Sequence, residues 1–404
     1  MSDVIVIGAG IVGAACARAL ARDGARVTLV DRRTPATGTS AHGEGNVLVS
    51  DKGPGPELDL ARYASSLWPA LVAELADELG PQFPSLEYER KGGLVAATTD
   101  DGARPLLQFA LDQQAEGVDA RPVEIAEARE LEPDLSPAIT AAVYYPEDAQ
   151  VQPVVATEAL LASARRLGVT VRPQTDVIDA LTTHGRITGV RTSTGLLRAD
   201  AVVVAAGPWS GGVSERLGAP LPVRPRRGMV IVTTRTPHRI RHKVYDGDYF
   251  GATQSGDAAL QTSAVVESTA AGTVLIGSSR EQVGFDTRLR VEVLAAIAER
   301  ALRLFPSLAG ASAMRSYLGF RPYVPDHLPV IGADERQRGL WFATGHEGAG
   351  IGLAPATGEI LAALVSGTVP AVDAAPFRPG RPGLTPATLE SGDPAPDTAE
   401  ETAS

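Results

Sequence analysis

The order of elements in the first 31 residues constrains the fold more than any other feature of the chain. Residues 4–7 predict a strand, residues 11–22 a helix, and residues 26–30 a second strand that ends at Asp31. At that position a carboxylate can accept hydrogen bonds from ribose hydroxyls. The turn before the helix has the spacing G-x-G-x-x-G, formed by Gly8, Gly10 and Gly13. Together these features predict a binding site for a dinucleotide.

Each glycine of this turn has a physical role that a larger residue could not fill. Gly8 permits the tight turn, Gly10 lets the backbone approach a pyrophosphate, and Gly13 lets the helix pack closely on the strand. Ile11 and Val12 begin the helix, where free N–H groups and the helix dipole favour phosphate groups. A flexible loop is the alternative for a lone glycine motif, but it does not explain the flanking strands, helix and acid.

Composition narrows the class of protein. Of the 404 residues, 44% are hydrophobic, which suits a large core in two interleaved domains. No apolar run approaches the roughly 20 residues of a membrane helix. The chain enters its first strand without a leader, so we expect a cytoplasmic protein, with peripheral membrane attachment as an alternative. The net charge of −11 argues against nucleic acid as a partner. The single cysteine, Cys16, excludes an internal disulfide, and no metal site is expected.

The apolar character of the middle and end of the chain predicts that the dinucleotide domain is discontinuous. Residues 201–206 predict a buried parallel strand, and residues 345–350 form a second glycine-rich turn before a helix. The fold class is therefore α/β, or α+β overall, with a Rossmann-like domain and a second domain on a mostly antiparallel sheet. The predicted boundaries are 1–86, 151–216 and 330–367 for the first domain, 87–150 and 217–329 for the second, and 368–404 for a largely disordered tail.

Three local expectations follow from shorter patterns. Residues 88–98 predict a strand pair that turns at Gly92 and Gly93. Residues 314–331 predict an irregular connection. The basic residues between 235 and 243 predict a solvated hairpin, with an acidic partner as the alternative.

Six ordered stretches carry a resemblance to a known family. They are GAGIVG at 8–13, GTSAHGEGN at 38–46, TDV at 175–177, VVVAAGPWS at 202–210, FRPYVPDHLPVIG at 320–332 and GHEGAGIGLAPATGE at 345–359. The chain resembles the D-amino acid oxidase superfamily of flavoproteins, which holds glycine oxidase, sarcosine oxidase and D-amino acid dehydrogenase. Two of the stretches look most like the flavin subunits of D-hydroxyproline dehydrogenase, opine oxidase and hydrogen cyanide synthase.

The resemblance implies FAD as the cofactor and assigns contacts along its length. Beyond the glycine turn, the implied contacts are Asp31 and Arg32 at the adenosine end, the backbone of Val177 at the adenine, Thr39, Ser40, Gly45 and Asn46 at the pyrophosphate and the isoalloxazine edge, Ala206, Gly207 and Trp209 under the cofactor, and Gly345, Gly348, Gly350 and Ile351 at the pyrimidine end. We expect FAD to be non-covalent. His42 precedes Gly45 with the spacing of the flavin-linking histidine of demethylating relatives, so a covalent bond is the alternative.

Amine oxidation by a flavin moves a hydride from the substrate α-carbon, so the protein must anchor the substrate carboxylate and supply a positive field. Arg321 is the candidate anchor because a guanidinium matches a carboxylate with two parallel hydrogen bonds. The N–H groups of Gly350 and Ile351 are the candidates for the field. His346 is a candidate catalytic residue, with a simple hydrogen-bonding role as the alternative. Tyr249 and Tyr245 are candidates for a lid, with core packing as the alternative.

The predicted function is FAD-dependent oxidation of a small amino acid to an imine, by hydride transfer from the α-carbon to flavin N5. A glycine-rich site with few acids at the substrate end would admit a secondary amine such as hydroxyproline, proline or sarcosine. A stand-alone glycine oxidase or D-amino acid dehydrogenase is one alternative, and a non-catalytic flavin-binding subunit is another. One cysteine is too few for an iron–sulfur cluster, so electrons must pass to oxygen, a quinone or a partner subunit.

Overall fold

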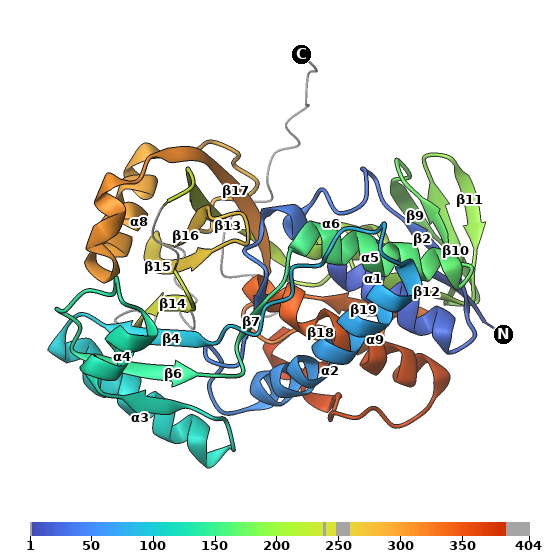
Figure 1. Ribbon diagram of the computed structural model, residues 1–404. Coiled ribbons are helices and arrows are strands. Elements are labelled where there is room, and N and C mark those ends of the chain that lie inside the picture. The colour runs from blue at the N-terminus through green and yellow to red at the C-terminus, as the bar shows by residue number, and fades with distance from the viewer. Residues whose placement is uncertain (1, 237–239, 248–258, 385–404) are drawn as a thin grey trace.

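The computed structural model describes residues 2–236, 240–247 and 259–384. Two sheets with their covering helices lie side by side (Figure 1). The first sheet is formed, in the described part of the chain, by β18 (Val330–Ala333), β19 (Leu340–Thr344), β12 (Ala201–Val204), β1 (Asp3–Ile7), β2 (Arg26–Val30) and β8 (Thr170–Arg172), in that order. All neighbours pair in parallel except β18 and β19.

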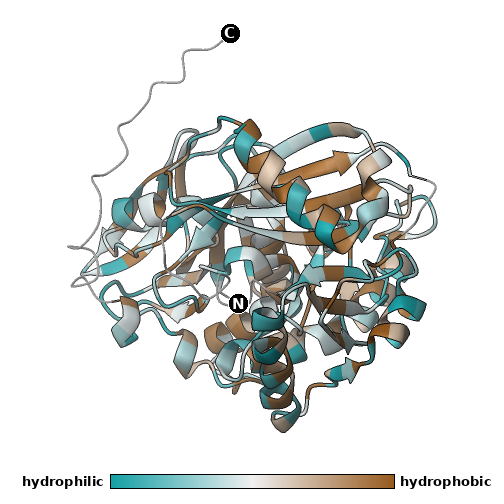
Figure 2. Ribbon diagram, turned by 90° about the vertical axis from the view of Figure 1, so that its left-hand side faces the viewer, coloured by the Kyte–Doolittle hydropathy of each residue, from teal (hydrophilic) through white to brown (hydrophobic). Residues whose placement is uncertain are grey.

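Strand β1 is buried on both faces because its residues alternate between two cores. Val4 and Val6 pack among the helices α1 (Ile11–Arg22), α2 (Pro56–Leu79), α5 (Pro153–Arg166) and α9 (Gly350–Ser366). Ile5 and Ile7 pack on the opposite side with residues of a three-stranded meander, which is formed among the described residues by β9 (Val177–Thr183), β10 (Arg186–Thr192) and β11 (Gly195–Arg198). Figure 2 shows the hydrophobic colour gathered in the interior strands and helices.

The glycines of the first turn fit tightly. Gly8 has a φ of +109° and lies against the backbone of Ala205. A β-carbon at Gly13 would overlap the carbonyl oxygen of Gly8, so only glycine lets α1 begin this close to β1. Strand β1 has β2 as its neighbour on one side and β12 on the other. The strand order therefore reverses direction at β1, and such a reversal creates a crevice at the carboxyl ends of the strands.

The second sheet lies across this crevice from the first sheet, so residues of both sheets line it. In the described part of the chain its order is β17 (Ala313–Tyr323), β13 (Arg224–Thr233), β16 (Val274–Arg280), β15 (Gln261–Ser268), β14 (Lys243–Asp246), β4 (Gly93–Ala97), β6 (Ala141–Tyr145) and β5 (Arg121–Val123). Pairing is antiparallel except between β14 and β4. Helix α8 (Val291–Leu304) packs on it through Val293, Ile297, Ala301 and Leu304, which recur at helical spacing.

The remaining elements are short or peripheral. They are α3 (Asp100–Ala115), α4 (Ile125–Leu131), α6 (Ser210–Arg216) and the two-residue pair β3 (Asn46–Val47) and β7 (Ala149–Gln150). The fold class predicted from the sequence is confirmed. The predicted domain boundaries stay a proposal, although the first sheet draws on residues 3–30, 170–204 and 330–344 and the second on residues 93–145 and 224–323.

Two strand predictions were wrong. Residues 313–323 are not an irregular connection but the edge strand β17, which pairs with β13 along its length. Pro322 lies opposite Pro225 there, and an edge strand tolerates proline because one side needs no N–H donor. Residues 88–98 do not pair with one another, because β4 takes β6 and β14 as neighbours.

Two surface predictions also need correction. The start of the expected tail is packed: Phe377 is fully buried, and Arg381 donates to both carboxylate oxygens of Asp326 at 2.6 and 2.9 Å. Residues from 385 on lie outside the described range. In the basic segment, Lys243 is buried and bonded to Glu267 rather than solvated, while residues 237–239 lie outside the described range.

One described helical stretch, Glu347–Ser366, is long and apolar enough to cross a membrane by length and composition. It contains α9, which is mostly buried and packs against α1 and α2 within the protein. The same apolar character is therefore explained by its place in the core.

Candidate functional site

A cavity of about 260 Å³ lies between the two sheets. Most of the residues predicted to bind a cofactor line it. These are Gly8, Gly10, Ile11, Val12, Asp31, Arg32, Thr39, Ser40, His42, Asn46, Val177, Ala206, Gly207, Trp209, Gly348, Gly350 and Ile351, together with Arg321 and His346.

Three predicted cofactor-binding residues are placed differently. Gly13, Gly45 and Gly345 do not line the cavity. A β-carbon at Gly45 would overlap the carbonyl oxygen of Val151, and at Gly345 it would lie 3.0 Å from Cγ1 of Val324, so these glycines allow close packing behind the wall. Tyr249 lies outside the described residues, but Tyr245 is buried and lines the cavity.

Asp31 and the start of α1 form one end of the cavity. The N–H groups of Ala9 and Arg33 donate to the two oxygens of Asp31 at 2.7 and 2.8 Å. Each oxygen keeps a second lone pair for a ligand hydroxyl. Arg32 stacks over the ring of Trp209 at 4.6 Å, and both residues line the cavity with Asp31.

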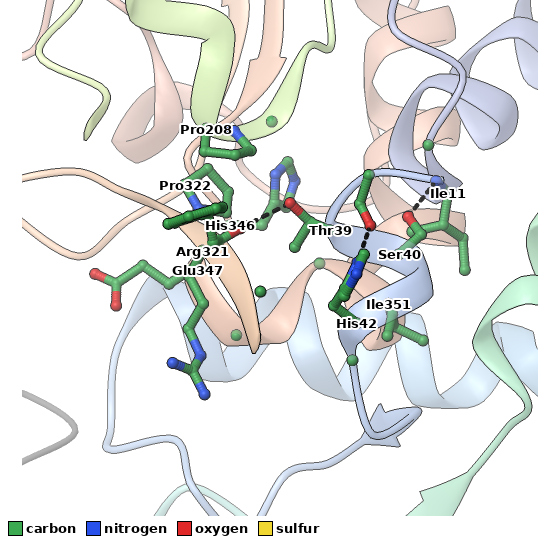
Figure 3. A pocket seen from close by; sticks show the side chains of 18 of the residues that line it. Ile11, Thr39, Ser40, His42, Pro208, Arg321, Pro322, His346, Glu347 and Ile351 are labelled. Carbon is green, nitrogen blue, oxygen red and sulfur yellow. Dashed lines mark hydrogen bonds between the residues drawn. The ribbon is translucent and has the colours of Figure 1, made fainter. Parts of the chain in front are cut away.

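The turn Thr39–His42 joins the start of α1 to strand β17 of the second sheet (Figure 3). Oγ of Ser40 accepts the N–H of Ile11 at 3.0 Å, so its own hydroxyl proton remains available to a phosphate at the helix start. Oγ1 of Thr39 donates to the carbonyl of Phe320 on β17 at 2.7 Å. Nδ1 of His42 lies 2.8 Å from the carbonyl oxygen of Gly38, which leaves Nε2 as its free nitrogen.

Arg321 projects from β17 into the other end of the cavity. Its Nη1 donates to the carbonyl of Ser279 at 2.8 Å, and no carboxylate among the described residues lies within ion-pair distance of it. Figure 3 shows its guanidinium pointing away from Glu347, whose carboxylate binds Arg226 and His327. Burial lowers the pKa of Arg321 to about 10, and the nearby Arg280 adds to this effect.

His346 is buried within the second glycine-rich turn. Its Nε2 lies 2.9 Å from Oγ1 of Thr357, about two helical turns into α9. Burial lowers the pKa of His346 to about 3, so the ring is neutral at physiological pH. Its contacts favour the hydrogen-bonding alternative over a proton-transfer role.

Acidic residues at the Arg321 end were missed by the sequence analysis, which expected few of them there. Glu44, Asp51, Asp246 and Glu347 all line the cavity. Glu44 lies in the stretch GTSAHGEGN, but nothing in that pattern indicates that residues 230 positions later bury it.

The donors and acceptors of the cavity fit a dinucleotide. Asp31 suits a ribose, and the start of α1 with the Ser40 hydroxyl suits a pyrophosphate. Buried oxygens without a hydrogen-bond partner among the described residues gather toward the other end, where a polar ring or substrate would satisfy them. They are Glu44 Oε1, Asn46 Oδ1, Ser50 Oγ, Asp51 Oδ1 and the hydroxyl of Tyr245. FAD therefore fits the residues present.

Comparison with known proteins agrees with this geometry. Residues 3–364 match the family profile described as DAO, FAD dependent oxidoreductase. Glycine oxidase of Pseudomonas aeruginosa is 33% identical over 384 residues, covering 93% of this chain and 98% of that protein. The HcnC subunit of hydrogen cyanide synthase from the same organism is 30% identical over 428 residues, covering 96% and 98%. The crystal structure of glycine oxidase from Geobacillus kaustophilus superposes with a TM-score of 0.83 at 28% identity, covering 94% and 98%. The resemblance and the cofactor predicted from the sequence are thus confirmed, and the chain belongs to the DAO family of FAD-dependent oxidoreductases.

Proposed function

We propose that the protein oxidises a small α-amino acid at its Cα–N bond to an imine. The observation that supports this most is the partly buried guanidinium of Arg321, which has a carbonyl but no carboxylate partner among the described residues. A cation that is partly shielded from water and has no counter-ion is destabilised, and a substrate carboxylate would offset this with two parallel hydrogen bonds.

The chain's own residues would orient the substrate and stabilise the developing charge. When bound, FAD supplies the acceptor for the α-hydrogen and its electron pair. Arg321 would fix the carboxylate and thereby the direction of the α-hydrogen. The N-terminus of α9, with Gly350 and Ile351 at the cavity wall, carries about half a unit of positive charge toward the site.

The substrate class is a small amino acid, with a secondary amine such as hydroxyproline, proline or sarcosine as our first choice. Glycine is the second candidate, favoured by the 33% identity with a glycine oxidase. We further propose that electrons leave to oxygen, a quinone or a partner subunit. Cys16 is buried in α1 and burial raises the pKa of its thiol to about 12, so it does not suit a cluster ligand.

Anaerobic mixing of the FAD-loaded protein with a panel of amino acids tests this proposal. The panel holds glycine, sarcosine, and both hands of alanine, proline and hydroxyproline, and the readout is bleaching of the flavin. We expect at least one of these amino acids to bleach the flavin. Oxygen uptake, measured separately in air with that substrate, identifies an oxidase. A flavin that no amine reduces would favour a non-catalytic flavin-binding subunit instead.

A further inference from the structure

Glu44 is a buried carboxylate to which no donor in the described part of the chain forms a hydrogen bond. It lines the cavity between the turn Thr39–His42 and strand β3. Its Oε1 is sealed from solvent, and no described residue donates a hydrogen bond to either oxygen. A buried polar group of this kind requires a partner that enters the cavity.

The position of Glu44 relative to Arg321 is set by one strand. A β-carbon at Gly277 of β16 would overlap Oε1 of Glu44, so the carboxylate lies directly over that glycine. Two residues further along β16, the carbonyl of Ser279 accepts the hydrogen bond from Arg321. The carboxylate of Glu44 and the guanidinium of Arg321 therefore both lie against the short segment 277–279 of β16. This arrangement suits a small zwitterion between them.

The other carboxylates at the Arg321 end of the cavity form ion pairs with basic residues of the protein. Asp51 binds Lys52 at 2.7 Å, Asp246 binds Arg300 at 3.3 Å, and Glu347 binds Arg226 and His327. Asp31 and Asp176 lie with Val177 and Arg32 at the other end. At the Arg321 end of the cavity, Glu44 is thus the lining carboxylate that forms no ion pair with a described residue.

The charged groups around Glu44 do not neutralise it by contact. Burial raises the pKa of Glu44, while Lys243, Arg321 and Arg280 oppose this rise and Glu267 adds to it. Lys243 is bonded to Glu267, not to Glu44. Burial raises the pKa of Tyr245 and Tyr317, the negative charge of Glu44 adds to this rise, and both hydroxyls therefore stay protonated. A carboxylate with a raised pKa is a better proton acceptor for an ammonium group than an exposed one.

We propose that Glu44 binds the ammonium group of the amino acid whose carboxylate Arg321 holds, and removes one proton from it. The N–H bond breaks, an O–H bond forms on Glu44, and the electron pair stays on nitrogen. That lone pair would assist the loss of the α-hydrogen and its electron pair, for which bound FAD would supply the acceptor, and the substrate would become a protonated imine. This role rests on the proposed function, and it selects zwitterionic amino acids over simple carboxylates.

Two unreactive ligands of nearly equal shape separate this role from that of Arg321. α-Aminoisobutyrate is zwitterionic but has no α-hydrogen, and pivalate replaces its ammonium group with a methyl group. Calorimetric titration of the FAD-loaded protein at pH 8 gives both affinities. Hydrogen bonds to charged groups are among the strongest in proteins. We therefore expect the wild type to bind α-aminoisobutyrate on the order of tenfold to a hundredfold more tightly than pivalate. Glu44→Gln should abolish this preference while pivalate binds as before.

Two controls make the result decisive. Glu299→Gln, at an exposed α8 ion pair with Arg303, should leave the preference unchanged. Glu44→Asp, which keeps the charge, should retain part of it. In the wild type the affinity for α-aminoisobutyrate should fall as acid protonates Glu44, and Glu44→Gln should lose that dependence. Wild-type protein that binds both ligands equally, or Glu44→Gln that keeps the preference, would overturn the role of Glu44. Binding of neither ligand would instead contradict the proposed function.

Discussion

The guanidinium of Arg321 lies directly over Gly228 on the neighbouring strand. A β-carbon at Gly228 would come within 2.7 Å of Cζ and 2.8 Å of Nη2 of Arg321. Gly228 pairs with Gly319, so two glycines face each other where the arginine crosses from β17 to β16. The absence of a side chain on Gly228 is what lets a long cation lie flat at the cavity wall, whereas Gly319 makes room for His42, whose Cβ would lie 2.6 Å from a β-carbon there.

Gly228→Ala should therefore displace Arg321 without touching the dinucleotide end. We expect the KM for the amino acid to rise about tenfold or more, because a 1 Å shift degrades a bidentate contact. Bound FAD per protein should stay as in the wild type. Gly212→Ala is the matched control, since no atom lies within 4 Å of a β-carbon there. Steady-state kinetics of both variants check the prediction, and an unchanged KM in Gly228→Ala would contradict it.

Asp31→Ala should weaken FAD binding by about tenfold to a hundredfold, about 1–3 kcal/mol. The substitution removes a ribose acceptor and leaves the N–H groups of Ala9 and Arg33 without their present partner. Titration of apoprotein with FAD measures the dissociation constant. Asp179→Asn, at an exposed pair with Arg191, provides a control that should bind FAD normally. Equal affinities for Asp31→Ala and wild type would remove Asp31 from the site.

His346 should make the protein less stable in acid. Its pKa is about 3 in the folded protein and about 6.5 when unfolded, so protons favour the unfolded state. The stabilisation is complete above pH 6.5 and is lost as the pH falls toward 3. At pH 5 the loss is about 2 kcal/mol. Urea unfolding at pH 7.5 and pH 5 should show a smaller difference in His346→Gln than in wild type. His184→Gln, at an exposed turn, should behave as wild type.

FAD should leave the protein on acid denaturation. His42 has its Nδ1 occupied by the Gly38 carbonyl, and we assign it to lining the cavity rather than to a covalent bond. Mass spectrometry of the denatured chain should give the mass of the polypeptide alone, with the yellow colour in the supernatant. A chain heavier by one FAD would establish the covalent alternative, and His42→Ala should then abolish the added mass.

The opening turn was predictable from the sequence because its evidence is local. Helix α1 begins at Ile11 and ends at Arg22 as predicted, and Gly8, Gly10 and Asp31 reach the cavity. Their spacing along fewer than 30 residues carries the geometry of a strand, a turn and a helix.

The substrate end was less predictable because its contacts join distant parts of the chain. Arg321 was selected because its guanidinium matches a carboxylate, but its strand was missed because Pro322 and the glycines hide the alternation of an edge strand. Glu44 was missed because Gly277, which makes room for it, lies more than 200 residues away. Phe377 sits in a Pro- and Ala-rich stretch whose composition suggests disorder, yet its ring fills the first core.

Arg321→Met tests the central claim most directly. Methionine keeps the unbranched stem and removes the cation, so only the carboxylate contact should be lost. With the best amino acid from the panel, anaerobic mixing should show at least about a hundredfold slower bleaching of the flavin, as expected for the loss of two charged hydrogen bonds. FAD content and spectrum should match the wild type. An Arg321→Met protein that is reduced as fast as wild type would contradict the account.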